Sequence, residues 1–169
     1  MLKDYLDKEQ TSVHTYAFIV YQYGRMKLNI SNLKLGWYSG IARKELRVEL
    51  TDLINVLRLL NEQVTKEPIL VRTIRPVPTR ETLEEILDNV WDQIAHLGWL
   101  VVHIWRQPYI TGYINNFKDT TNNLLSVCSS LAKLYNWGWL ELIGDGEERF
   151  RERMKDVSHW KGKSSNELV

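Results

Sequence analysis

Acidic side chains recur at helical spacing in two separate parts of this sequence. In the first part, Glu45, Glu49 and Asp52 are four and three residues apart, so in a helix they point roughly the same way. The second part has similar steps and ends on a histidine: Glu85, Asp88, Asp92 and His96. Carboxylates from two facing helices are a common way for a protein to hold a hard cation such as Mg²⁺. The candidate metal ligands are therefore Glu49, Asp52, Asp88 and Asp92.

This metal hypothesis requires that the two acidic helices pair as a tight antiparallel hairpin. In such a hairpin Asp52 lies near Asp92 or Asn89, and Glu49 lies near His96. A bound Mg²⁺ would then hold a nucleoside triphosphate and activate water for the release of pyrophosphate.

Both acidic series contain an ExxD frame, one formed by Glu49 and Asp52 and the other by Glu85 and Asp88. In these frames the middle third of the chain resembles the all-α nucleotide pyrophosphohydrolases of the MazG type. The resemblance implies an Mg²⁺-dependent nucleoside triphosphate pyrophosphohydrolase. The chain departs from the family's pattern because the first motif lacks a paired glutamate at its head and the interval between the two motifs is longer than usual.

A solvent-exposed flank of an ordinary packed helix explains the same acidic series without any cofactor. Arg43 and Arg47 share the helical turns of Glu49, so on this interpretation Glu49 meets an arginine or water at the surface. The acids around Glu85 follow a Pro-Thr start, where a helix N-terminus favours negative charge. ExxD spacing is also common in amphipathic helices, which favours the explanation without a metal.

No complete catalytic set is evident, so no catalytic residue is assigned. His96 and His103 share a helix face, but no third nitrogen or sulfur ligand follows at metal spacing, which favours structural histidines. Cys128 lies between leucines of an apolar seam and is expected to be a buried side chain rather than a nucleophile. The sequence has no Gly-rich phosphate loop, nucleophile elbow or zinc pattern.

The spacing of leucines and other apolar residues predicts the elements that position these side chains. Long helices are expected at residues 4–27, 33–64, 78–107 and within 117–136, and a short fifth helix is expected after Asp145. The proline-rich segment 66–80 is the clearly non-helical connector. In the first helix, several apolar residues lie near one face: Tyr5, Val13, Ala17, Val20 and Tyr21.

These elements predict an all-α fold, namely an antiparallel four-helix bundle with a short extra C-terminal helix. The second and third helices should form its central hairpin. Residues 1–160 are expected to be a single domain and residues 161–169 a disordered tail. The predicted core consists of Leu50, Leu53, Leu57, Leu87, Val90, Ile94, Leu97 and Val101.

The composition is that of one ordinary globular domain. The chain has 169 residues, of which 44% are hydrophobic, and its 22 basic and 21 acidic residues give a formal net charge of +1. This balance creates no overall field for a polyanionic partner. A single cysteine and the lack of an apolar segment long enough to cross a bilayer predict a cytoplasmic protein without a membrane partner.

Aromatic residues are unusually frequent, with seven Trp and eight Tyr. Large rings with a polar tip are enriched at protein interfaces. The interface candidates are Trp105, Tyr109, Trp137 and Trp139. The leading hypothesis is therefore a non-enzymatic helical-bundle protein that acts through protein–protein contacts, as an assembly subunit, inhibitor or adaptor. A homo-oligomer or a complex with a protein partner is expected.

Two basic segments support a further alternative, a helical nucleic-acid-binding subunit. The candidate basic residues are Arg72, Arg75, Arg80, Arg149, Arg151 and Arg153. Together with neighbouring aromatic rings they would contact a phosphate backbone. Acidic residues are interspersed in the second segment, so this hypothesis is not favoured over protein–protein contact.

Overall fold

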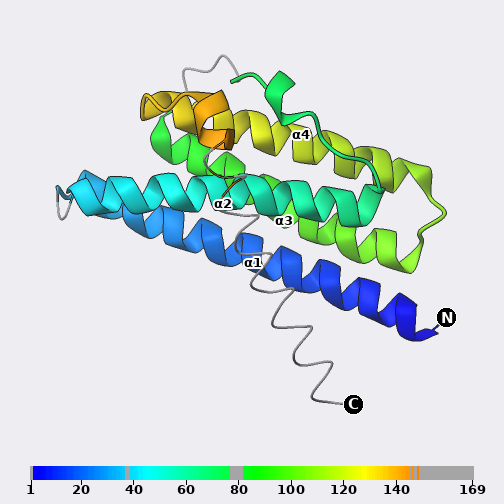
Figure 1. Ribbon diagram of the computed structural model, residues 1–169. Helices are drawn as coiled ribbons and strands as arrows, with labels where there is room; N and C mark the ends of the chain where they lie inside the picture. The colour runs from blue at the N-terminus through cyan, green and yellow to red at the C-terminus, as the bar shows by residue number, and fades with distance from the viewer. Residues whose placement is uncertain (1, 37–38, 77–81, 145, 147, 149–169) are drawn as a thin grey trace.

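The computed structural model describes residues 2–36, 39–76, 82–144, 146 and 148, with the backbone alone for residues 2–11. The long helices are α1 (Leu2–Lys34), α2 (Ser39–Thr65), α3 (Leu83–Arg106) and α4 (Thr111–Leu134). A 3₁₀ turn, η1 (Val71–Thr73), lies between α2 and α3, and a short helix covers residues 139–144 (Figure 1). The described part of the chain has no strand, and the predicted four-helix bundle with a short extra helix is confirmed.

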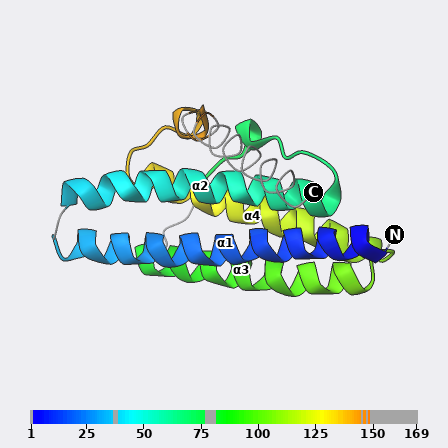
Figure 2. The same cartoon turned by 60° about the horizontal axis from the view of Figure 1, so that its bottom comes forward.

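The helices follow the order α1, α2, α4, α3 around the bundle, because α1 and α4 each pack against both α2 and α3 (Figure 2). Helices α2 and α3 are therefore diagonally opposite, and the predicted central hairpin of these two helices is wrong. The short connections at 35–38 and 107–110 make hairpins of α1 with α2 and of α3 with α4. The longer connector at 66–82 lets the chain cross from one hairpin to the other.

The boundary between the first two helices also differs from the prediction. The first helix was expected to end near residue 27, but it continues to Lys34, and the Ser31 hydroxyl donates to the carbonyl of Lys27 one turn earlier inside α1. Gly24 lies inside α1, where packing of the inward face holds the helix together on both sides of it. Likewise α4 begins at Thr111 rather than near residue 117, and the short helix begins at residue 139, before Asp145 rather than after it, with residues 146 and 148 also helical. Most of the residues after Asp145, where the short fifth helix was expected, lie outside the described residues.

The predicted core is confirmed. All eight of its members are buried: Leu50, Leu53, Leu57, Leu87, Val90, Ile94, Leu97 and Val101. Helix α1 adds four side chains to this core, namely Ile19, Tyr23, Met26 and Ile30, and α4 adds Phe117. Because these residues come from all four helices, one continuous hydrophobic core holds the bundle.

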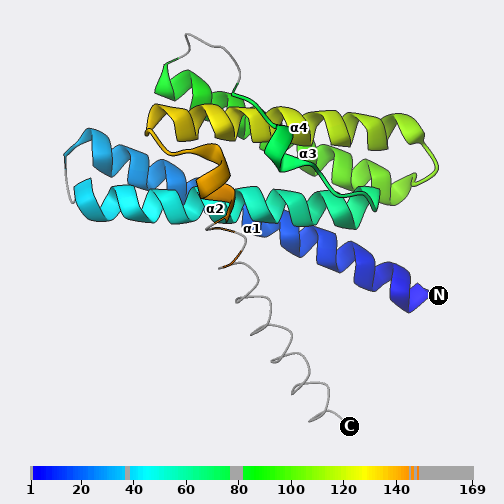
Figure 3. The ribbon, with the colours of Figure 1, turned by 45° about the horizontal axis from the view of Figure 1, so that its top comes forward.

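Helix α2 is buried on every side over its middle part, from Glu49 to Leu57. Helices α1 and α4 cover two sides, and the chain after α4 crosses over the third (Figure 3). At this crossing the backbone of Gly146 lies so close to α2 that an added Cβ would be 2.8 Å from the Asn55 amide nitrogen. An amphipathic helix with one wet flank was expected here, whereas α2 is the central helix of the fold.

The opposite side of α1 packs on α3 through two tyrosines. The Tyr16 hydroxyl donates to the carbonyl of Ile94 at 3.1 Å, and the Tyr23 hydroxyl donates to the carbonyl of Leu87 at 3.0 Å. A Cβ added at Gly98 would collide with the Tyr16 ring, so this glycine allows the close approach. Within the described residues, no helix is both long enough and apolar enough to traverse a membrane.

Candidate functional site

The four carboxylates proposed as metal ligands do not converge. Glu49 and Asp52 are buried in α2, whereas Asp88 and Asp92 are exposed on α3, the helix diagonally opposite. The α3 pair lies closer to α1, where burial first and then the negative charges of Asp88 and Asp92 raise the pKa of Tyr23. The described residues include no group of three or more His, Cys, Asp or Glu side chains that could hold a metal ion. The convergence that the metal hypothesis requires is therefore not found among these residues, because it depended on a hairpin of α2 with α3 that the fold does not have.

Glu49 is a buried carboxylate with partners from α1. Its two oxygens each accept a hydrogen bond of 2.8 Å from the Asn29 side-chain amide, and the Arg25 Nε atom lies 3.4 Å from one of them. Burial raises the pKa of Glu49, while the Asn29 hydrogen bond and the Arg25 charge partly oppose this effect. The expectation that Glu49 would meet Arg43, Arg47 or water at the surface is wrong. These contacts with Asn29 and Arg25 fix the register between α1 and α2, so the role of Glu49 is structural.

Arg43 and Arg47 lie beside Trp137 instead, at 5.6 and 5.9 Å from its ring centroid. Trp137 is only 8% exposed and stacks on Tyr135 with ring centroids 5.1 Å apart. Arg43 also donates to the Tyr135 carbonyl at 2.6 Å. Trp137 was predicted to be an interface residue, but its ring packs inside its own chain.

The other proposed interface rings do not form one surface with Trp137. Trp139 is half-buried and its indole nitrogen donates to the carbonyl of Val71 at 2.8 Å, which ties the short helix to η1. Trp105 and the 77% exposed Tyr109 lie at the opposite end of α4. Since α4 has 24 residues, the two ends are about 36 Å apart. The structure therefore separates the proposed candidates into two distant groups.

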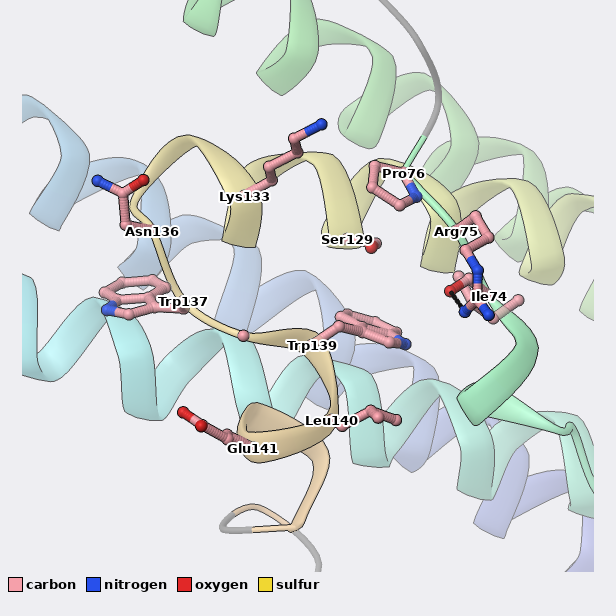
Figure 4. Close-up of a pocket in the computed structure, with 11 residues that line it drawn as sticks. Ile74, Arg75, Pro76, Ser129, Lys133, Asn136, Trp137, Trp139, Leu140 and Glu141 are labelled. Carbon is pink, nitrogen blue, oxygen red and sulfur yellow. Dashed lines mark hydrogen bonds between the residues drawn. The ribbon is translucent and has the colours of Figure 1, made fainter.

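An open trough of about 530 Å³ lies between the connector, α4 and the short helix (Figure 4). Ser129 on its α4 wall is buried, and its hydroxyl has no hydrogen-bond partner among the described residues. Arg75 also lines the trough, but its guanidinium donates to the carbonyls of Arg72 and Ile74, which holds it on the connector. No described histidine or carboxylate hydrogen-bonds the Ser129 hydroxyl, so the trough offers no activated nucleophile.

Of the basic residues predicted to contact nucleic acid, the structure describes Arg72 and Arg75 as exposed on the connector. The remaining four lie outside the described residues: Arg80, Arg149, Arg151 and Arg153. The nucleic-acid hypothesis stays a prediction.

His96 and His103 each contact a neighbouring residue of their own chain, and Cys128 is buried as expected from the sequence. His103 stacks on Trp99 with ring centroids 3.7 Å apart, and its Nδ1 atom lies 2.8 Å from the Trp99 carbonyl oxygen. His96 lies with its Nε2 atom 3.3 Å from the Asn116 side-chain oxygen. Burial raises the pKa of the Cys128 thiol to about 12, so the thiolate is not formed at neutral pH.

The surface that sequence reasoning missed lies on α1. Five residues on its solvent side, and Leu35 directly after its last residue, follow one another at alternating steps of four and three, and we call them the outer stripe: Ala17, Tyr21, Gly24, Leu28, Ser31 and Leu35. All six are exposed, and the three largest side chains are 58%, 64% and 61% exposed at Tyr21, Leu28 and Leu35. Part of this surface could be identified from the sequence, because Ala17 and Tyr21 were predicted to lie near one apolar face of the first helix.

Comparisons with protein-family models, with curated proteins and with solved structures find no match to this chain.

Proposed function

We propose that this protein acts by binding another protein chain through the outer stripe of α1. The main observation that supports this proposal is that the outer stripe has the spacing of a coiled-coil seam and contains no charged residue. Assembly subunits, inhibitors and adaptors all use such a surface. A cytoplasmic location fits the proposal, since a single cysteine leaves the chain without an internal disulfide.

The composition of the outer stripe favours a helical partner. Tyr21 and Leu28 supply large side chains, and Gly24 between them has no neighbouring atom within 4 Å of an added Cβ. A partner helix can therefore approach the α1 backbone closely at Gly24 and pack against the larger side chains on either side of it. Single exposed apolar residues are ordinary, but an ordered series along one helix is typical of a binding surface.

Charged residues flank the outer stripe rather than interrupt it. Arg25 lies over the Tyr21 ring at 5.7 Å and reaches toward Glu49 on the α2 side. On the α3 side, Lys34 forms an ion pair with Glu84. This arrangement, an apolar centre with a polar rim, is that of a protein–protein interface.

Site-specific photo-cross-linking tests this proposal. A photoreactive amino acid replaces Leu28 in the outer stripe, and a matched variant carries it in place of Leu134, which is a 52% exposed leucine on α4. In cells that express the full chain, the variant at residue 28 should give a discrete adduct of one added protein mass, and the variant at 134 should not. Introducing Leu35→Glu into the variant at residue 28 should abolish the adduct. Absence of a discrete adduct at 28, or an equal adduct at both positions, would refute the proposal.

A further inference from the structure

We infer that the trough between the connector, α4 and the short helix binds a small organic anion, namely a carboxylate or a phosphate ester attached to a flat apolar ring. The inference goes beyond the proposed function, because the trough and the outer stripe of α1 share no residue. Its basis is a buried hydroxyl without a described partner, together with two basic side chains and a fixed tryptophan ring that line the same trough.

The Ser129 hydroxyl is the polar group at the floor of the trough. Hydroxyls within a helix commonly donate to the carbonyl four residues earlier, as Thr121 and Ser130 of α4 do at 2.8 and 3.2 Å. Ser129 is only 2% exposed, yet its hydroxyl makes no such bond and has no partner among the described residues. Figure 4 shows it directed into the trough, toward the space between Pro76 and Trp139. Because a buried hydroxyl without a partner costs stability, a ligand oxygen that accepts its hydrogen bond is favourable here.

Two basic side chains make the surroundings of Ser129 positive. Lys133 lies one turn later on the same face of α4, and its ammonium group makes no ion pair with any described residue. Arg75 lines the trough from the connector, and two hydrogen bonds from its Nη1 atom to carbonyls hold the guanidinium in place. The carboxylate of Glu141 lies instead against Gly138, away from Ser129 (Figure 4). An anion is therefore favoured beside Ser129.

The rest of the lining is suited to a flat apolar group. The indole nitrogen of Trp139 donates to the carbonyl of Val71 at 2.8 Å, so the position of this ring is fixed. Ile74, Pro76 and the 60% exposed Leu140 extend the apolar lining. Aromatic groups pack favourably on such a ring by offset stacking. A volume of about 530 Å³ with few polar groups is typical of small-molecule sites.

Titration of the full chain with naphthoate and with naphthyl phosphate, followed by heteronuclear NMR, tests the site. The signals of the Trp139 indole and the Ser129 amide should shift and saturate with at least one of these anions, and the anion that binds more tightly identifies the class of ligand. The neutral naphthamide should bind at least tenfold more weakly, as should acetate and inorganic phosphate, which lack the ring. No saturable shift with either anion, or equal binding of naphthamide, would overturn the inference.

Substitutions of two exposed lysines test the role of charge. Lys133→Met should weaken binding of the tighter anion at least tenfold, whereas Lys27→Met on α1 removes the same charge far from the trough and should leave binding unchanged. Equal effects of the two substitutions would contradict the site.

Ser129→Ala separates binding from folding. This variant should bind the anion several-fold more weakly, while its stability in urea unfolding should equal or exceed that of the wild type, because the hydroxyl has no described partner to lose. Wild-type affinity in Ser129→Ala would refute the role of the hydroxyl in binding.

Discussion

Replacing Asn29 with alanine should destabilise the protein in a pH-dependent manner, because Asn29 solvates a buried carboxylate. The Asn29 amide nitrogen lies 2.8 Å from both oxygens of Glu49, and Glu49 is only 3% exposed. A hydrogen bond to a charged group contributes about 1.5–3 kcal/mol. At pH 7.5, well above the ordinary carboxyl pKa of 4.5, Asn29→Ala should therefore lower the free energy of unfolding by about 2–3 kcal/mol.

The pH dependence follows from the direction of the pKa shift. Burial raises the folded-state pKa of Glu49 above its ordinary value of 4.5. The folded protein thus holds the proton more tightly than the unfolded chain, so this group favours folding most below pH 4.5 and loses that contribution as pH rises through the folded-state pKa. The Asn29 hydrogen bond lowers the pKa. Removing it should raise the pKa further and extend the loss of stability to higher pH.

At pH 4.5 the cost of Asn29→Ala should fall to about 1 kcal/mol, the contribution of a hydrogen bond between neutral groups. Urea unfolding followed by circular dichroism at pH 4.5 and 7.5 gives both values. The control is Glu49→Gln, which keeps the shape and removes the charge. In that background Asn29→Ala should cost about 1 kcal/mol at both pH values. The reasoning is refuted if Asn29→Ala costs the same at both pH values in the wild-type background.

Three further predictions concern the core, the glycines and the cysteine. Leu53→Ala should cost about 2–5 kcal/mol in urea unfolding because Leu53 is fully buried, whereas Leu70→Ala at a 72% exposed position should change stability by less than about 0.5 kcal/mol. Gly24→Ala should stabilise the protein by about 0.5–1 kcal/mol, because Gly24 lies in a helix and an added Cβ meets no neighbouring atom. Gly98→Ala must displace the Tyr16 ring, so this variant should be less stable than Gly24→Ala by about 1–3 kcal/mol. Equal effects of the two substitutions would contradict the close α1–α3 contact. The Cys128 thiol should react with a thiol reagent at neutral pH no faster than the protein unfolds, because it is buried and its pKa is about 12; rapid labelling of the folded protein would show that the α4 seam is open.

Apolar spacing was enough to predict the buried side of α2 and α3. Leu50, Leu53 and Leu57 repeat at four and three residues, and a helix has only one side on which such a series can lie. The same spacing does not say which helix covers that side. The lengths of the connections decide which helices pair. Because the connector between α2 and α3 is long, these two helices do not form a hairpin, and the predicted pairing was wrong.

Helix α1 shows a second limit of apolar spacing. It carries one apolar series at Ile19, Met26 and Ile30, which is buried, and another at Tyr21 and Leu28, which is exposed. Both have helical spacing, so periodicity alone does not choose between them. The choice follows from which series meets the leucines of α2, and this is a tertiary property.

The burial of Glu49 was also outside the reach of local reasoning. Its nearest charged neighbour in sequence is Arg47, which favoured an exposed ion pair. Its partners, Asn29 and Arg25, are instead about twenty residues away on α1. A carboxylate is buried only where hydrogen-bond donors or positive charges contact it. For Glu49 these donors can be identified only when the register of the α1–α2 hairpin is known.

The central position of α2 has a consequence for how the chain matures on the ribosome. The side of α2 at Thr51 and Asn55 is covered by the backbone of Gly146, which is synthesised only after α3 and α4. Until then, that side of α2 is exposed to solvent in the nascent α1–α2 hairpin, and so are the leucines of α2 that later pack against α4. Fragments that stop after α2 or before residue 137 should accordingly be caught by chaperones or degraded, and the native fold should form only after nearly the whole described chain has left the exit tunnel.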